Sequence, residues 1–267
     1  MSIVTISRGS YSHGREVAET VAKKLGYECV SREILLEASS EFNVPQLRLL
    51  HAIADTPSFL DRFRFGKERY LAYIQAALLD HFQKDNVVYH GLAGHFFVRN
   101  VSHVLKVRII AEMEDRVKLF MQRERTTRED EAREAVETLD EERRKWGRYF
   151  YGIDTQDASL YDLVIRIKKL SAGHAAEMIC HAVESSDTFQ ATKQSQQAVD
   201  DLTLAARVRA SLIDHYPRAG VTADGGVVHV GLEGATSRDE GQVQETARKI
   251  AGVKSVEITR YPFITPD

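Results

Sequence analysis

The chain has 267 residues, of which 43% are hydrophobic and 28% charged. These proportions are typical of globular proteins and exclude a disordered chain, a collagen and a disulfide-rich miniprotein. The 36 basic and 39 acidic residues leave a net charge of −3, which is not the charge of a dedicated nucleic-acid binder. We therefore expect no nucleic-acid partner.

Three further features bear on the compartment. Cys29 and Cys180 are too few for a disulfide framework or a cysteine-rich zinc site, which favours a reducing compartment. The first residues lack the basic segment and long apolar run of a signal peptide. No window approaches the roughly 18 uninterrupted apolar residues of a membrane span. We expect a cytoplasmic protein with no membrane span.

The polar stretch from Glu184 to Gln197 divides the chain. It is rich in Ser, Thr and Gln and nearly free of large apolar residues, which predicts a linker. A polar extension of the preceding helix is the alternative. We take residues 1–185 as one domain, 186–198 as the linker and 199–267 as a second domain.

The first domain alternates strand and helix patterns. A β-rich run at 3–7 is followed by a glycine-bearing loop and by a helix that Gly26 ends. Further strands are predicted at 86–90, 104–111 and 163–167, and helices at 69–82, 114–124 and 127–149. This alternation predicts an α/β domain whose mainly parallel sheet has helices on both faces.

The second domain has a different order of elements. A helix at 199–213 precedes strands at 219–223 and 227–232, which flank the hairpin signal Asp224-Gly225-Gly226. A helix at 238–250 and a strand at 255–260 follow. The order α-β-β-α-β predicts a small α+β domain.

The strongest chemical signal lies directly after the first strand. Residues 9–16 have the spacing of the phosphate-binding motif G-x-x-x-x-G-K-[ST], in which backbone N–H groups and a helix N-terminus hold phosphate oxygens. Arg15 replaces the lysine and can grip phosphate bidentately, whereas Glu16 replaces the hydroxyl that binds Mg²⁺. An ordinary turn between strand and helix is the alternative. The predicted nucleotide-binding residues are Gly9, Ser10, Tyr11, Ser12, His13, Gly14, Arg15 and Glu16.

The run IVTISRGSYSHGREVAETVAKKLGYECVSREIL, from Ile3, resembles the cytidylate kinase-like family of P-loop proteins. That family has the pattern I-S-R-x-x-G-S-G-G-R, then L-G, then D-[RK]-E. The resemblance continues in NVVYHG at 86–91, in the arginine-bearing stretch 115–152 and in YDLVI at 161–165. It covers about residues 1–185.

This resemblance implies a nucleoside-monophosphate-kinase fold with a five-stranded parallel core, a monophosphate-binding arm and a lid. ATP with Mg²⁺ would be the donor, and Arg15, Arg123 and Arg143 would stabilise the transferred phosphoryl group. The stretch that carries the lid arginines also reads as an ordinary salt-bridged helix. Arg32, His90 and Gly91 are the predicted substrate-binding residues, with His90 at the carboxyl end of a predicted strand.

The chain departs from the family pattern at several positions. Leu92 stands where the family has arginine, and Ser31 stands where it has aspartate. Tyr11 and His13 replace glycines of the loop, and Glu112 is the carboxylate nearest to the end of the strand at 104–111. ATP-dependent phosphoryl transfer to a nucleoside monophosphate or related small molecule is our leading interpretation. A catalytically weak or inactive nucleotide-binding sensor is the alternative.

The second domain resembles a BON domain. VVHVGLEG at 227–234 and ARKIAGVKSV at 247–256 carry this resemblance, which implies a module that binds a ligand or a partner. One further segment, at 59–70, is basic and aromatic and falls where the kinase family has its monophosphate arm. It fits substrate binding, contact within a homo-oligomer, or a solvated amphipathic helix.

Overall fold

The structure is a computed structural model that describes residues 2–31, 33–45, 66–91 and 94–262. The chain divides into two compact units, each described by itself. The first comprises Met1–Glu33, Ile53–Asp61 and Lys84–Ala191. The second comprises Ile34–Ala52, Arg62–Gln83 and Thr192–Asp267. Helix segments from the middle of the sequence thus join the C-terminal part.

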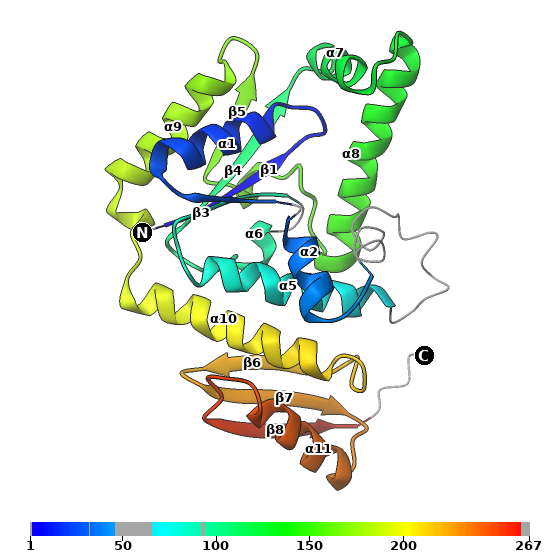
Figure 1. Cartoon of the computed structure of the whole chain (residues 1–267), viewed down its shortest axis with the longest axis vertical. Helices are drawn as coiled ribbons and strands as arrows, with labels where there is room; N and C mark the ends of the chain where they lie inside the picture. The colour runs from blue at the N-terminus through cyan, green and yellow to red at the C-terminus, as the bar shows by residue number, and fades with distance from the viewer. Residues whose placement is uncertain (1, 32, 46–65, 92–93, 263–267) are drawn as a thin grey trace. The chain divides into compact units, whose positions relative to one another are not determined.

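A parallel five-stranded sheet forms the centre of the first unit (Figure 1). Its strands are β1 (Ile3–Arg8), β2 (Glu28–Val30), β3 (Val87–His90), β4 (Val104–Ala111) and β5 (Leu163–Ile167), in the order β2-β3-β1-β4-β5. Val4 of the central strand lies beside Val88 on one side and Leu105 on the other. Strands buried on both faces form continuous apolar runs, which is why these segments could be recognised in the sequence. The predicted α/β fold is confirmed.

Helices α1 (Gly14–Leu25) and α9 (Ala172–Ser185) pack together over the sheet (Figure 1). Val17 and Val21 of α1 share a buried core with Ile179 of α9 and with strand residues such as Ile6 and Ile109. The short helix α6 (Gly94–Phe97) contacts β1. This core fixes the end of β1 from which the loop to α1 departs.

Two helices follow β4 and form a hairpin (Figure 1). They are α7 (Met113–Glu124) and α8 (Glu129–Tyr151), which match the helices predicted at 114–124 and 127–149. Arg125 ends α7 in the left-handed conformation, and Gly152 ends α8 in the same way. The hairpin carries the arginines that the sequence analysis places in a lid.

The second unit contains a three-stranded sheet and four helices among the described residues. Strands β6 (Gly220–Asp224) and β7 (Val227–Glu233) pair antiparallel, and β8 (Ser255–Tyr261) pairs parallel with β7. The helices are α2 (Glu33–Glu41), α5 (Gly66–Phe82), α10 (Lys193–Leu212) and α11 (Ser237–Arg248). Val208 and Leu212 of α10 pack with Val228, Val230 and Val243 in a core of their own. The order from α10 to β8 is the predicted α-β-β-α-β.

The start of α10 differs from the sequence-based expectation. It begins at Lys193, within the polar stretch interpreted as a linker, and not near Val199. The side chain of Thr192 accepts a hydrogen bond from the N–H of Ser195, and the side chain of Ser195 accepts one from the N–H of Thr192. The two bonds form a capping box. A polar stretch that is capped and rich in good helix formers forms helix as readily as linker.

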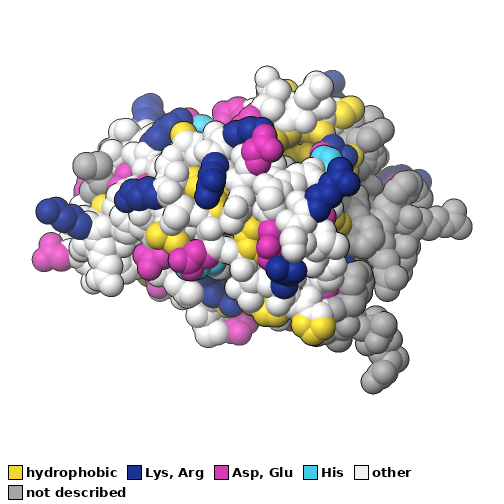
Figure 2. Space-filling model, turned by 90° about the horizontal axis from the view of Figure 1, so that it is seen from below, with side chains coloured by type: hydrophobic (Ala, Val, Ile, Leu, Met, Phe, Trp, Pro, Cys, Tyr) yellow, Lys and Arg dark blue, Asp and Glu magenta, His cyan; other side chains and the backbone are white. Residues whose placement is uncertain are grey.

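The surface shown in Figure 2 carries lysine and arginine side chains interspersed with acidic ones and with scattered hydrophobic spots. This distribution agrees with the small net charge of −3. Within the ranges that the structure describes, no helix is both long and apolar enough to cross a membrane.

Candidate functional site

The loop between β1 and α1 is held against the end of β4. The N–H of Gly9 donates to the carbonyl of Ile109 at 3.2 Å. The Ser12 hydroxyl lies 2.9 Å from the Gly9 carbonyl and 3.2 Å from that of Ile109. At Gly14, a Cβ atom would lie 2.7 Å from side-chain carbons of Arg8, so the close approach requires glycine. The loop therefore has a defined shape at the carboxyl ends of two central strands.

Two bulky residues of this loop adopt left-handed backbone conformations. Tyr11 has a φ of 56° and His13 a φ of 62°, in positions where the family pattern has glycine. Each non-glycine residue in this conformation raises the free energy of the folded state by on the order of 1 kcal/mol or more, which its contacts must offset. The Tyr11 ring packs edge-on against Phe120 of α7, and its hydroxyl donates to Glu124 at 2.8 Å. Burial and this carboxylate raise the pKa of Tyr11.

A buried guanidinium and a carboxylate hold the next peptide of the loop. Arg116 of α7 donates through Nε to the carbonyl of Ser10 at 2.7 Å and pairs through Nη2 with Asp140 of α8 at 2.5 Å. The Ser10 N–H donates to the other carboxylate oxygen of Asp140 at 2.9 Å. Both polar backbone groups of Ser10 are thus bonded to side chains of the α7–α8 hairpin.

The two predicted lid arginines also lie against the loop. Arg143, one turn after Asp140 on α8, has Nη1 at 3.4 Å from the Arg8 carbonyl. The guanidinium carbon of Arg123 lies 5.8 Å from the centre of the Tyr11 ring. The structure therefore brings Arg123 and Arg143 together at the loop, from two different helices.

Arg15 has a different position. Its side chain is 64% exposed, and its Nε donates to Glu19 of the same helix at 2.7 Å. Glu16 is bonded to the ring of His13 at 3.0 Å. The structure thus places the Arg15 guanidinium and the Glu16 carboxylate beside other side chains of the loop and α1.

The predicted substrate-binding residues are placed in part. His90 is buried at the carboxyl end of β3, and Gly91 follows it. A Cβ atom at Gly91 or Gly94 would collide with the Tyr89 ring, so the chain can pass Tyr89 only with glycine at both positions. Arg32 and Leu92 lie outside the described residues, as does most of the segment at 59–70.

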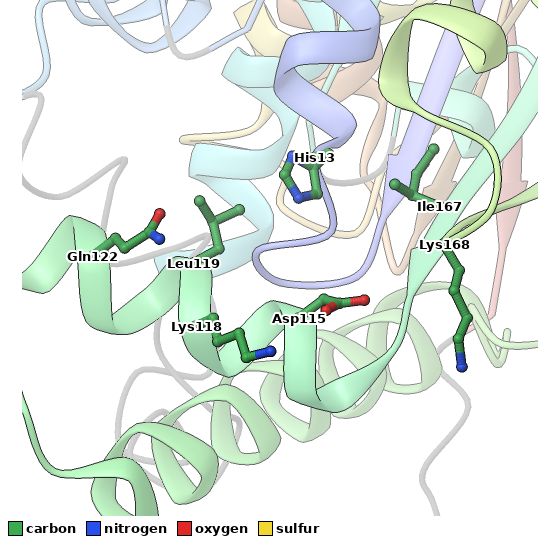
Figure 3. A pocket seen from close by; sticks show the side chains of 7 residues that line it. All are labelled: His13, Asp115, Lys118, Leu119, Gln122, Ile167 and Lys168. Carbon is green, nitrogen blue, oxygen red and sulfur yellow. The ribbon is translucent and has the colours of Figure 1, made fainter.

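A cavity of about 370 Å³ adjoins the loop (Figure 3). His13 reaches it from the loop, Asp115, Lys118, Leu119 and Gln122 from α7, and Ile167 and Lys168 from the end of β5. The carboxyl ends of parallel strands are where α/β proteins bind ligands. The sequence analysis missed Lys118 and Lys168, although Lys168 follows a recognisable strand directly. The cavity thus adds two cations beside the loop.

One further carboxylate lies at the end of β4 and pairs with cations at the end of β5. Glu112, the carboxylate nearest to the end of β4, pairs with Arg166 and, at 3.7 Å, with Lys168. Among the described residues there is no group of three or more His, Cys, Asp or Glu side chains that could hold a metal ion. Glu112 is placed to neutralise Arg166 of β5 and Lys168 directly after that strand.

The sheet order, the loop after the central strand and the arginine-bearing hairpin define an α/β protein of the P-loop kinase-like class. The sequence profile of the cytidylate kinase-like family matches residues 3–169, and the chain belongs to this family.

The known relatives of this chain differ in how much of it they match. The cytidylate kinase of Methanosarcina acetivorans is 36% identical over 107 residues, which cover 39% of this chain and 58% of that protein. The cytidylate kinase of Archaeoglobus fulgidus is 30% identical over 185 residues, covering 68% of this chain and 94% of that protein. An uncharacterized protein from Eubacterium ventriosum has a similar fold, with a TM-score of 0.53 at 19% identity over 70% of this chain and 100% of that chain. The match to the first relative thus spans little more than half of its length.

Proposed function

We propose that this protein transfers a phosphoryl group from ATP to a nucleoside monophosphate or a related small molecule. One observation carries the proposal: Arg123 and Arg143 reach the same glycine-bearing loop from two helices of the hairpin. Phosphoryl transfer requires positioned phosphates and positive charge around the transferred group, and little covalent chemistry from the protein. A loop and two converging arginines supply both requirements. The cytidylate kinase names of the relatives support the same reaction class.

The loop and the start of α1 would hold the donor phosphates. Backbone N–H groups at a helix N-terminus attract anions, and the cavity beside the loop adds Lys118 and Lys168. The Arg15 guanidinium would also bind the phosphates by giving up its ion pair with Glu19. Such an exposed ion pair contributes little free energy and is readily replaced. Arg123 and Arg143 would then cover the transferred group and exclude water.

ATP and Mg²⁺ fit this site in different ways. The buried hydroxyl of Ser10 has no hydrogen-bond partner among the described residues, so the loop retains a polar group for a phosphate oxygen. Mg²⁺ commonly keeps several waters and is held by substrate phosphates with one or two carboxylates. Glu16, which stands at the motif's metal position, would hold Mg²⁺ together with the phosphates of the nucleotide, and the ion would neutralise charge on those phosphates.

The acceptor would bind through the predicted substrate-binding residues Arg32, His90 and Gly91, of which His90 ends β3. The basic, aromatic segment at 59–70 would contribute further cations. Cationic side chains there would bind the monophosphate of the acceptor. The segment at 59–70 falls where the family resemblance has the monophosphate arm.

The alternative is a nucleotide sensor with little or no turnover. The contact of Asp140 with the Ser10 N–H favours it, because a carboxylate there opposes the approach of phosphate. In this alternative the BON-like module, residues 199–260, would bind a ligand or partner and report nucleotide binding to it. The module has this binding role under either function.

Calorimetric titration tests both functions. ATP, ADP, AMP and CMP are each titrated with Mg²⁺, and the same samples are then assayed for nucleotide conversion. Binding of ATP with conversion of a monophosphate supports the kinase, whereas tight binding without conversion supports the sensor. Absence of binding to any nucleotide contradicts both.

A further inference from the structure

A second cavity, of about 390 Å³, lies within the first unit. Its walls come from α6 and the residues after it, from the start of β4, and from the chain between α8 and β5. Leu160, on its wall, precedes β5, whereas the cavity at the loop between β1 and α1 touches Ile167 at the other end of that strand. The five residues of β5 span about 13 Å, so the two cavities are separate. A volume of this size is in the range of small-molecule sites.

Two cations line this second cavity. Arg99 is exposed after α6, and Lys106 is half-buried in β4. The Lys106 ammonium donates to the Arg99 carbonyl at 3.0 Å, which holds it beside that residue. Among the residues that the structure describes, no carboxylate lies within ion-pair distance of either cation. Both positive charges therefore remain available to a ligand.

The two carboxylates among the described lining residues are already bonded within the chain. Asp154 pairs with Arg144 at 3.2 Å and with Arg148 at 2.5 Å. The Asp157 carboxylate accepts hydrogen bonds from the N–H and the hydroxyl of Ser159, at 2.9 and 2.7 Å. Since two arginines neutralise Asp154, the cations around the cavity outnumber the carboxylates. The cavity is therefore better suited to an anion than to a cation.

One wall of the cavity is aromatic and apolar. The centre of the Phe96 ring lies 4.0 Å from that of His95, and Ile153 and Leu160 also line the cavity. His95 is buried, and its Nε2 has no hydrogen-bond partner in the described parts of the chain. Burial lowers the pKa of this ring to about 3, so the ring is neutral at physiological pH. A buried polar atom without a partner costs free energy, which a polar group of a ligand at Nε2 would offset.

We propose that this cavity binds a phosphate monoester of a compact aromatic or apolar molecule. The phosphate would lie between Arg99 and Lys106, and the apolar body would lie against Phe96 and Ile153. A phosphate monoester carries nearly two negative charges at pH 7, which matches two unpaired cations better than the single charge of a carboxylate does. Arginine also binds phosphate oxygens bidentately. The site is separate from the proposed phosphoryl-transfer site and does not depend on the proposed function.

The test is calorimetric titration of the full chain with phenyl phosphate as the probe. Inorganic phosphate lacks the aromatic ring, and benzoate lacks the second charge. We expect saturable binding of phenyl phosphate, and binding at least about 5-fold weaker for each of the other two anions. Arg99→Ala and Lys106→Met should each weaken the binding of phenyl phosphate about 5- to 10-fold. Arg133→Ala is the matched control, because it removes a cation of α8 that pairs with Glu114 and Glu129 outside the cavity.

Hydrogen exchange locates the bound probe. Phenyl phosphate should slow amide exchange over residues 152–160 in the wild type and not in Arg99→Ala. Slower exchange over residues 9–16 instead would place the probe at the loop between β1 and α1 and would overturn the proposal. Equal affinities of the wild type and Arg99→Ala, or equal affinities for phenyl phosphate and either comparison anion, would also overturn it. Absence of saturable binding would show that the cavity holds only water.

Discussion

The carboxylate of Asp140 accepts a hydrogen bond from the Ser10 N–H at 2.9 Å, although the two residues are 130 positions apart in the sequence. The same carboxylate pairs with the buried guanidinium of Arg116, which donates to the Ser10 carbonyl. An anion of the protein itself is thus bound at the loop that would bind phosphate. Because both partners of Ser10 lie on α7 and α8, the conformation of the loop depends on the position of the hairpin.

Asp140→Asn should bind nucleotide more tightly and unfold more easily. The substitution removes a negative charge beside the phosphates, which we expect to lower the Kd for ATP about fivefold. It also leaves the buried Arg116 without its counter-ion, so the thermal midpoint without nucleotide should fall. Calorimetry and thermal unfolding measure the two effects. Glu141→Gln, which removes the neighbouring charge on α8, is the control, and weaker ATP binding by Asp140→Asn would contradict the expectation.

Arg143→Ala and Arg123→Ala should lower turnover far more than nucleotide affinity. Their charge is needed most where negative charge develops in the transition state, so a loss of about 100-fold in kcat is expected. Steady-state kinetics with separate KM values for both substrates measure this. Arg128→Ala removes an exposed arginine at the start of α8 and serves as the control. Equal losses in kcat and in affinity would show that the two arginines already contact the substrates in the ground state and are not specific to the transition state.

Arg15→Ala should weaken ATP binding by about 1–3 kcal/mol, the range of a charge-assisted hydrogen bond. The substitution breaks an exposed pair with Glu19, which contributes little free energy, so the stability of the protein should change little. Calorimetric titration with ATP measures the affinity. Lys23→Ala, in the last turn of α1, removes a charge of the same helix away from the loop. An unchanged affinity would exclude Arg15 from the nucleotide site.

His95 should make the protein less stable as the pH falls. Burial, with smaller contributions from Arg108, Lys106 and Arg99, lowers the pKa of His95 to about 3 in the folded chain. In the unfolded chain the His95 ring binds a proton near pH 6.5, whereas in the folded chain it stays neutral at that pH. The free energy of unfolding therefore decreases as the pH falls below 6.5. Between pH 7.5 and 5 the loss from this group is about 2 kcal/mol.

Urea unfolding of the wild type and of His95→Gln at these two pH values measures the difference. The variant lacks the ionisable ring, so its free energy of unfolding should depend less steeply on pH. Equal pH dependence of the two proteins would show that His95 does not carry the effect.

The sequence by itself determined four of the five strands of the first unit, the loop after β1 and the α-β-β-α-β order of the tail. Those features depend on local patterns, such as the apolar run at 104–111 or the glycines at 9 and 14, and the structure has them where they were predicted. Strand β2 and helix α2 were not predicted, because three residues of strand and a helix without a clear apolar stripe give little local signal.

Only the tertiary structure decided which distant groups meet. The contact of Arg116 with Ser10 joins residues 106 positions apart, and that of Thr203 with Leu79 joins residues 124 positions apart. No periodicity predicts such pairs, because they follow from the order of strands in the sheet and from the packing of whole helices. For the same reason the packing of α5 with α10 could be read only from the folded chain.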